Sequence, residues 1–184
     1  MEKTRNSIFR TIFGMMISPS NTLSNALNGT KWYITAIISS MAFGLFFIQT
    51  GIDLYKTGQK GIGFVLLSGI SGFLYGLIII PLLAVLVYGI LKLAKTDKTI
   101  IQVISSFCLS YSGALIYGIL GLLFSMFLGW KTSVAFGVTG VLWAIGPMIV
   151  SVREMLGGNI TLCILLSTVV STLVLTSWSI LGNI

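Results

Sequence analysis

Five long runs without a charged residue constrain the fold of this chain more than any other feature. A transmembrane helix needs about 20 consecutive apolar residues, and each run is long enough for one such helix but too short for two. The sequence therefore predicts an all-α integral membrane protein with a five-span bundle over residues 31–184. The expected helices cover residues 32–51, 62–91, 100–128, 132–152 and 160–182.

The composition supports the membrane class. The chain is 55% hydrophobic and only 8% charged, whereas a soluble domain carries about 25% charged residues. The formal net charge of +7 is explained by Lys and Arg residues that flank the spans and set their orientation. The lipid bilayer is therefore the expected partner, and nucleic acid is not.

The distribution of Lys and Arg predicts the orientation of the chain. With five spans, eight of these residues fall on the side that holds the N-terminus, and three fall on the opposite side. Because positive charge favours the cytoplasm, we expect a cytoplasmic N-terminus and an extracytoplasmic C-terminus. The larger group comprises Lys3, Arg5, Arg10, Lys31, Lys92, Lys95, Lys98 and Arg153, and the smaller one Lys56, Lys60 and Lys131.

Residues 1–30 precede the first span and form a separate cytoplasmic segment. Apolar residues recur there at helical spacing, which predicts an amphipathic helix that lies at the membrane surface. Ser18-Pro19 predicts the N-cap and first position of a second short helix that ends at about Leu27. The first helix has three open roles: it binds lipid, packs on its own bundle or binds a partner. Its apolar face holds Ile8, Phe9, Ile12, Phe13 and Met16, and the residues expected at the membrane surface are Arg5, Phe9, Arg10 and Phe13.

Local signals mark the ends and the bends of the spans. Thr99 and Gln102 have the spacing of a capping box, and Asn159 follows a glycine pair as a candidate N-cap. The second and third runs are longer than the hydrocarbon core is thick, so their helices must tilt, kink or extend beyond it. Pro81 in the second span and Pro147 in the fourth are the candidate kinks.

Small residues spaced four apart create packing faces in three spans. Gly72 and Gly76 form a GxxxG pattern in the second span, and Ser167 and Ser171 share a face of the fifth. Such faces let helix backbones approach closely in lipid. They predict packing either within the bundle or against a second copy or another membrane protein. In the third span the face consists of Ser106, Ser110, Ala114 and Gly118.

The sequence offers little for catalysis or metal binding. It has no histidine, and its four acidic residues fall outside the expected spans. Because nucleophilic catalysis needs a base and coupled transport usually needs an ionisable group within the bilayer, we expect no catalytic residue, metal site or cofactor. Cys108 and Cys163 are expected to be small buried apolar residues. The acidic residues are Glu2, Asp53, Asp97 and Glu154.

Several positions resemble the bacterial branch of the Yip family of five-span membrane proteins, named for their interaction with Ypt/Rab GTPases. The resemblance is carried by Pro19 shortly before Trp32, by Leu93-Ala94-Lys95 at the end of the second span, and by Tyr111 in the third. It covers most of the chain but rests on layout and these few residues. Pro19, Trp32 and Tyr111 are the matched positions.

The chain also departs from the family pattern. Gly113 or Ala114 takes the place of a proline, and Thr96-Asp97-Lys98 replaces a pair of glycines. The resemblance implies a non-enzymatic adaptor or accessory subunit in a bacterial plasma membrane. It would act through helix–helix contacts as a homo-oligomer or with another membrane protein, such as an ABC exporter.

Two other functions stay open from the residues themselves. The first is a small channel or permeation protein built around Pro81, Gly146-Pro147 and the hydroxyl groups of the third span, since hydrophobic gates need no charge. The second is a membrane protein that protects against membrane-active peptides.

Overall fold

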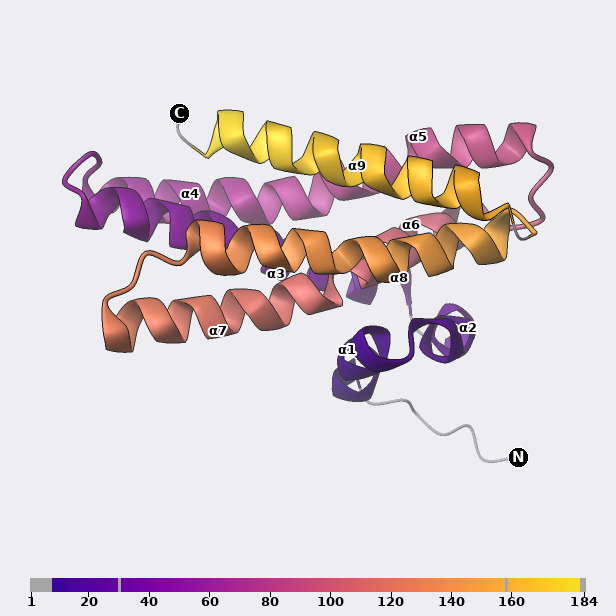
Figure 1. The fold of residues 1–184 in the computed structure, drawn as a ribbon, viewed down its shortest axis with the longest axis horizontal. Coiled ribbons are helices and arrows are strands. Elements are labelled where there is room, and N and C mark those ends of the chain that lie inside the picture. Colours follow the sequence, from indigo (N-terminus) through magenta and orange to yellow (C-terminus); the bar gives the residue numbers. More distant parts are fainter. Residues whose placement is uncertain (1–7, 30, 158, 183–184) are drawn as a thin grey trace.

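The computed structural model describes residues 8–29, 31–157 and 159–182, and all regular structure within these ranges is helical. Five helical segments are long and apolar enough to cross a membrane, which confirms the predicted all-α fold with five long apolar helices, and they run side by side along the long axis of the molecule (Figure 1). The spans are α3 (Trp32–Lys56), α4 to α5 (Ile62–Leu93), α6 to α7 (Ile100–Leu128), η2 with α8 (Ser133–Met155) and α9 (Ile160–Leu181).

The first span, α3, forms the centre of the bundle. It contacts α4 (Ile62–Leu74), α6 (Ile100–Ser110) and α7 (Ser112–Leu128) along its length. Within its most apolar window 72% of the residues are buried, against 33% for the second span and for α9. α3 is therefore the most buried of the five spans.

The second span packs closely on α3 and then changes its helical geometry. A Cβ atom at Gly72 would lie 2.5 Å from the carbonyl oxygen of Phe43, and one at Gly76 would meet the backbone of Ser39. A π-helical turn, η1 (Tyr75–Ile79), follows and leads into α5 (Ile80–Leu93). Proline has no N–H group to donate to the preceding turn. The π-helical turn η1 therefore lies just before Pro81, where the regular series of backbone hydrogen bonds is interrupted.

The third span is broken into two helices at Tyr111, although the sequence predicts one helix over 100–128. The N–H group of Tyr111 donates to the Cys108 carbonyl oxygen at 3.3 Å, which tightens the last turn of α6. The Ser112 hydroxyl donates to the Leu109 carbonyl oxygen at 2.7 Å and satisfies an acceptor freed by the break. Without a proline, the break has no local sequence signal, and it accompanies the full burial of the Tyr111 ring.

The helix caps predicted from the sequence are present, whereas charged residues do not mark the end of every span. Thr99 and Gln102 form the complete capping box, with hydrogen bonds of 3.0 and 3.3 Å, and Asn159 caps α9 through the Leu162 N–H group. The first span, in contrast, extends past the expected limit at 51 to Lys56, so Asp53 lies inside the helix. The fourth span ends at Met155, in the helix α8 (Thr139–Met155).

Two short helices precede the spans and lie beside the bundle. They are α1 (Ile8–Ile17) and α2 (Pro19–Gly29), so Pro19 opens the second helix as predicted. Figure 1 shows α1 next to the junction of α6 and α7 and α2 below α8, and α1 contacts α6 and α7 while α2 contacts α6 and α8. The two cross closely at Gly14, where a Cβ atom would lie 2.5 Å from the Thr22 hydroxyl oxygen.

Candidate functional site

Three polar side chains lie on one face of α3 near the end of that helix. Gln49, Asp53 and Lys56 are spaced by four and three residues, which places them on the same side of a helix. Asp53 is only 9% exposed and Gln49 is fully buried. Ionisable groups at such depth in a membrane protein are costly and frequently functional, so this face is the first candidate site.

Asp53 binds the start of the fourth span. Its Oδ2 atom accepts hydrogen bonds from the Ser133 N–H group at 2.8 Å and from the Ser133 hydroxyl at 2.7 Å. Ser133 is the first residue of η2 (Ser133–Val138), whose free N–H groups carry a partial positive charge. The carboxylate therefore caps this helix from a distant part of the chain.

Lys56 binds the end of the third span. Its Nζ atom donates to the Ser125 carbonyl oxygen at 2.8 Å, the Ser125 hydroxyl at 2.7 Å and the Trp130 carbonyl oxygen at 3.2 Å. These acceptors lie at the C-terminal end of α7 and in the turn that follows Gly129, where the helix dipole is negative. Asp53 and Lys56 thus bind, from one face of α3, the start of η2 and the end of α7. We call these two helices and the turn between them the α7–η2 hairpin.

Gln49 continues the same face into the bundle. Its Nε2 atom donates to the Gly118 carbonyl oxygen at 2.9 Å. A Cβ atom at Gly121 would overlap the Gln49 side-chain amide, so this glycine leaves the space that the amide fills. The close-packed positions of α7 against α3 are therefore Gly118, Gly121 and Ser125.

Three buried oxygen atoms of this region have no hydrogen-bond partner within the described ranges. They are Gln49 Oε1, Asp53 Oδ1 and Thr132 Oγ1. Oxygen atoms of this kind suit hard cations, but Asp53 already accepts two hydrogen bonds at the start of η2, and the Lys56 ammonium donates to three oxygen atoms at the end of α7. Because both charged groups bind helix ends, the arrangement suits a structural clamp better than a cation site.

A second polar and aromatic cluster lies at the junction of the second, third and fifth spans. The Phe43 ring packs between Tyr75 and Tyr111, with centroids 5.0 and 4.9 Å away. The Tyr75 hydroxyl forms a hydrogen bond of 2.5 Å with the Ser177 hydroxyl, which links the second span to α9. The Tyr111 hydroxyl is buried without a partner in the described part of the chain.

The small-residue faces predicted from the sequence are used largely within the chain. Gly72 and Gly76 face α3, as described above. The Ser106 and Ser110 hydroxyls are buried and donate to carbonyl oxygens one turn earlier, at 2.8 and 2.9 Å. Ala114 is half-buried, and its Cα atom lies 2.9 Å from a Cβ atom built at Gly140 of α8. The break at Tyr111 divides the predicted four-residue face between two helices.

The other predicted positions are spread over the molecule. Pro147 is buried inside α8, and its carbonyl oxygen accepts a hydrogen bond of 2.9 Å from the Ser151 hydroxyl. Trp32 is about half exposed at the start of α3. Phe9, Arg10 and Phe13 lie on the exposed side of α1. Arg5 lies outside the described residues.

The described residues contain no group of three or more His, Cys, Asp or Glu side chains that could hold a metal ion. Cys108 and Cys163 are both free and buried. A mostly apolar pocket of about 250 Å³ opens between the second span and the end of α9, and its lining includes Phe47, Phe64 and Leu181.

Comparison with protein-family models, curated proteins and solved structures finds no match for this chain. The resemblance to the Yip family therefore stays a prediction from the sequence.

Proposed function

We propose that this chain is a non-enzymatic membrane adaptor or accessory subunit of a bacterial plasma membrane, as its resemblance to the Yip family implies. The tight packing around the third span carries this proposal. Ser106, Ser110 and Tyr111, which would line a path through the third span, are all completely buried, so no water-sized space touches them. The outer surface is then what remains for function, and it offers apolar helix faces suited to another membrane helix.

The face formed by α4 and α9 is the best candidate for that contact. The second span and α9 are the least buried spans of the bundle, and the apolar pocket opens between them. Leu66, Leu67 and Ile70 of α4 are each more than half exposed. A partner helix laid along this face would cover these side chains and place one of its own in the pocket.

Site-specific photocrosslinking in native membranes tests the adaptor proposal. A photoreactive residue at Leu67, on the proposed face, is compared with one at Leu123, which is exposed on α7. We expect a discrete crosslinked protein of fixed mass from Leu67 and only lipid adducts from Leu123. Lipid adducts alone from both positions, together with a monomer of unchanged mass, would overturn the proposal.

A small channel is the second candidate, and one observation favours it. Gln49, Asp53 and Lys56 form a row of polar side chains that runs from one end of α3 into the bundle. Reconstituted liposomes decide between the two functions. Flux of ions or small solutes above that of empty vesicles, reduced by Gln49→Leu, would support the channel, whereas flux equal to that of empty vesicles would remove it.

A further inference from the structure

The first helix, α1, has two different apolar faces. Ile12 and Met15, together with Thr11, are buried against the rest of the chain. Phe9, Phe13 and Ile17 are spaced four apart and are 74, 54 and 83% exposed. The sequence pattern merged Phe9, Ile12 and Phe13 into one face, whereas the structure separates them into a docked face and an exposed stripe. We call Phe9, Phe13 and Ile17 the α1 stripe.

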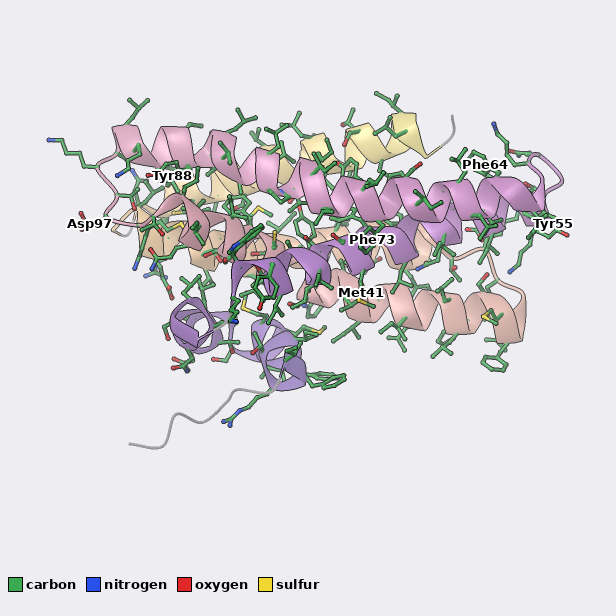
Figure 2. The ribbon with its side chains drawn as sticks, turned by 180° about the vertical axis from the view of Figure 1, so that it is seen from behind. Met41, Tyr55, Phe64, Phe73, Tyr88 and Asp97 are labelled. Carbon is green, nitrogen blue, oxygen red and sulfur yellow. The ribbon has the colours of Figure 1, made fainter. Side chains whose placement is uncertain are left out.

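The position of α1 shows what surrounds this stripe. The helix contacts α6 and α7, both parts of a membrane span. In Figure 2 the two N-terminal helices lie beside the bundle, between the levels of Asp97 at one end and Tyr55 at the other, and α2 lies closer than α1 to the Asp97 end (compare Figure 1). A helix that lies alongside spanning helices, rather than beyond their ends, is surrounded by lipid wherever the bundle does not cover it.

The chemistry of the N-terminal helices agrees with this placement. Arg10 is the only charged residue of α1, and it is exposed. The exposed positions of α2 are polar instead, namely Ser20, Asn21, Ser24 and Asn25. Apolar side chains with a neighbouring cation fit an anionic leaflet, and polar amides and hydroxyls fit water. Trp32 and Tyr33, both about half exposed, provide the aromatic residues typical of the membrane surface.

We infer that the α1 stripe is inserted into the cytoplasmic leaflet of an anionic bilayer, while the opposite face of α1 stays docked beside the break between α6 and α7. The leaflet named here rests on the proposed orientation, but the insertion itself does not. The inserted helix connects the lipid environment to the break at Tyr111, where the third span is divided without a proline. A change in the charge or the packing of the lipids in that leaflet would then shift α1 relative to the bundle.

Fluorescence of the full-length chain in lipid vesicles tests this insertion. An NBD group is attached to Phe13→Cys in the α1 stripe or, as the matched control, to Asn25→Cys on the polar side of α2. The native Cys108 and Cys163 are fully buried, and unsubstituted protein measures any background labelling. The vesicles contain phosphatidylcholine with or without 30% phosphatidylglycerol, and brominated acyl chains serve as the quencher.

We expect blue-shifted emission and strong quenching by brominated lipid at position 13, and neither effect at position 25. Arg10→Gln should lower the inserted fraction in the anionic vesicles by about fivefold and should have little effect in neutral vesicles. Equal water exposure at the two positions would overturn the inference. Shielding at position 13 that brominated lipid does not quench, and that rises with protein density, would assign the stripe to a second copy and also overturn it.

A second variant separates insertion from folding. Phe9→Ser combined with Ile17→Ser should reduce the quenching at position 13, while thermal unfolding stays close to that of the parent because both side chains are exposed. Unchanged quenching in this variant would contradict the insertion of the α1 stripe into the bilayer. This readout needs no protein partner, so its failure would leave the adaptor proposal standing, and failure of the crosslinking experiment would leave the insertion standing.

Discussion

At the scale of single residues, two opposite charges on α3 bind helix ends of opposite polarity. Asp53 accepts hydrogen bonds at the start of η2, and Lys56 donates to the end of α7. Each charge thereby interacts with a helix dipole as well as with individual donors or acceptors. The two side chains fix the α7–η2 hairpin to the central helix without forming a salt bridge that the structure records.

Removing the Asp53 carboxylate should weaken the bundle. Asp53→Ala leaves the Ser133 N–H group without its acceptor, and loss of such a cap costs about 0.5–2 kcal/mol. Thermal unfolding in detergent micelles measures the effect. Asp97→Ala, in an exposed loop, is the control and should change the free energy of unfolding by less than about 0.5 kcal/mol. Equal shifts for both variants would contradict the capping role.

Two buried tyrosines should respond with opposite sign to loss of their hydroxyl groups. The Tyr75 hydroxyl bonds Ser177, so Tyr75→Phe should cost about 1 kcal/mol. The Tyr111 hydroxyl is buried without a recorded partner, so Tyr111→Phe should leave stability unchanged or raise it by about 1 kcal/mol. Parallel unfolding curves measure both. A larger loss at Tyr111 than at Tyr75 would contradict the absence of a hydrogen-bond partner for the Tyr111 hydroxyl.

At the scale of elements, close approach and local geometry decide how the second span packs. Gly72 and Gly76 bring it against the α3 backbone, and the π-helical turn follows within the next residues. The α4 and η1 segments therefore touch α3 tightly along one stripe, while the other side of α4 stays exposed and α5 packs on α6. The proposed partner face lies on that other side.

Two glycines of the second span should tolerate alanine differently. At Gly76 a methyl group meets the backbone of Ser39 and Ser40, whereas at Gly89 no atom lies within 4 Å. Gly76→Ala should lower the unfolding temperature, because backbone atoms cannot move aside as side chains do. Gly89→Ala should be neutral or stabilising by up to about 1 kcal/mol, because alanine favours a helix. An equal response at the two sites would contradict the packing of Gly76 on α3.

At the scale of the whole molecule, an uneven distribution of charge accompanies an odd number of spans. The N-terminal side carries eight of the eleven basic residues, which is the basis of the proposed orientation. The spans place the 94–99 connection, the end of α8 and the start of α9 at one end of the bundle, opposite the 57–61 and 129–132 connections (Figure 1). The two ends can therefore be labelled separately.

Cysteine labelling in intact cells should report this orientation. Asp97→Cys and Lys131→Cys are both exposed positions at opposite ends, and the native cysteines are buried. A membrane-impermeant maleimide should label Lys131→Cys directly and Asp97→Cys only after the cells are permeabilised. The reverse pattern would place the N-terminus outside and would move the α1 insertion to the other leaflet.

Features that depend on local interactions and on segment length could be predicted from the amino-acid sequence. The five spans follow from apolar runs that match the thickness of a bilayer. The caps at Thr99 and Asn159 and the helix start at Pro19 follow from hydrogen bonds and backbone preferences within a few residues. None of these features needs a contact from a distant part of the chain.

The points at which the helices break and end, and the faces that they expose, depend instead on contacts between distant parts of the chain. Asp53 remains helical because Ser133, 80 residues away, satisfies its carboxylate. The sequence pattern instead treated this charge as the end of a span, although the spacing of Gln49, Asp53 and Lys56 could have indicated one helix face. The break at Tyr111 and the two faces of α1 likewise depend on packing between distant elements, which residue periodicity does not encode.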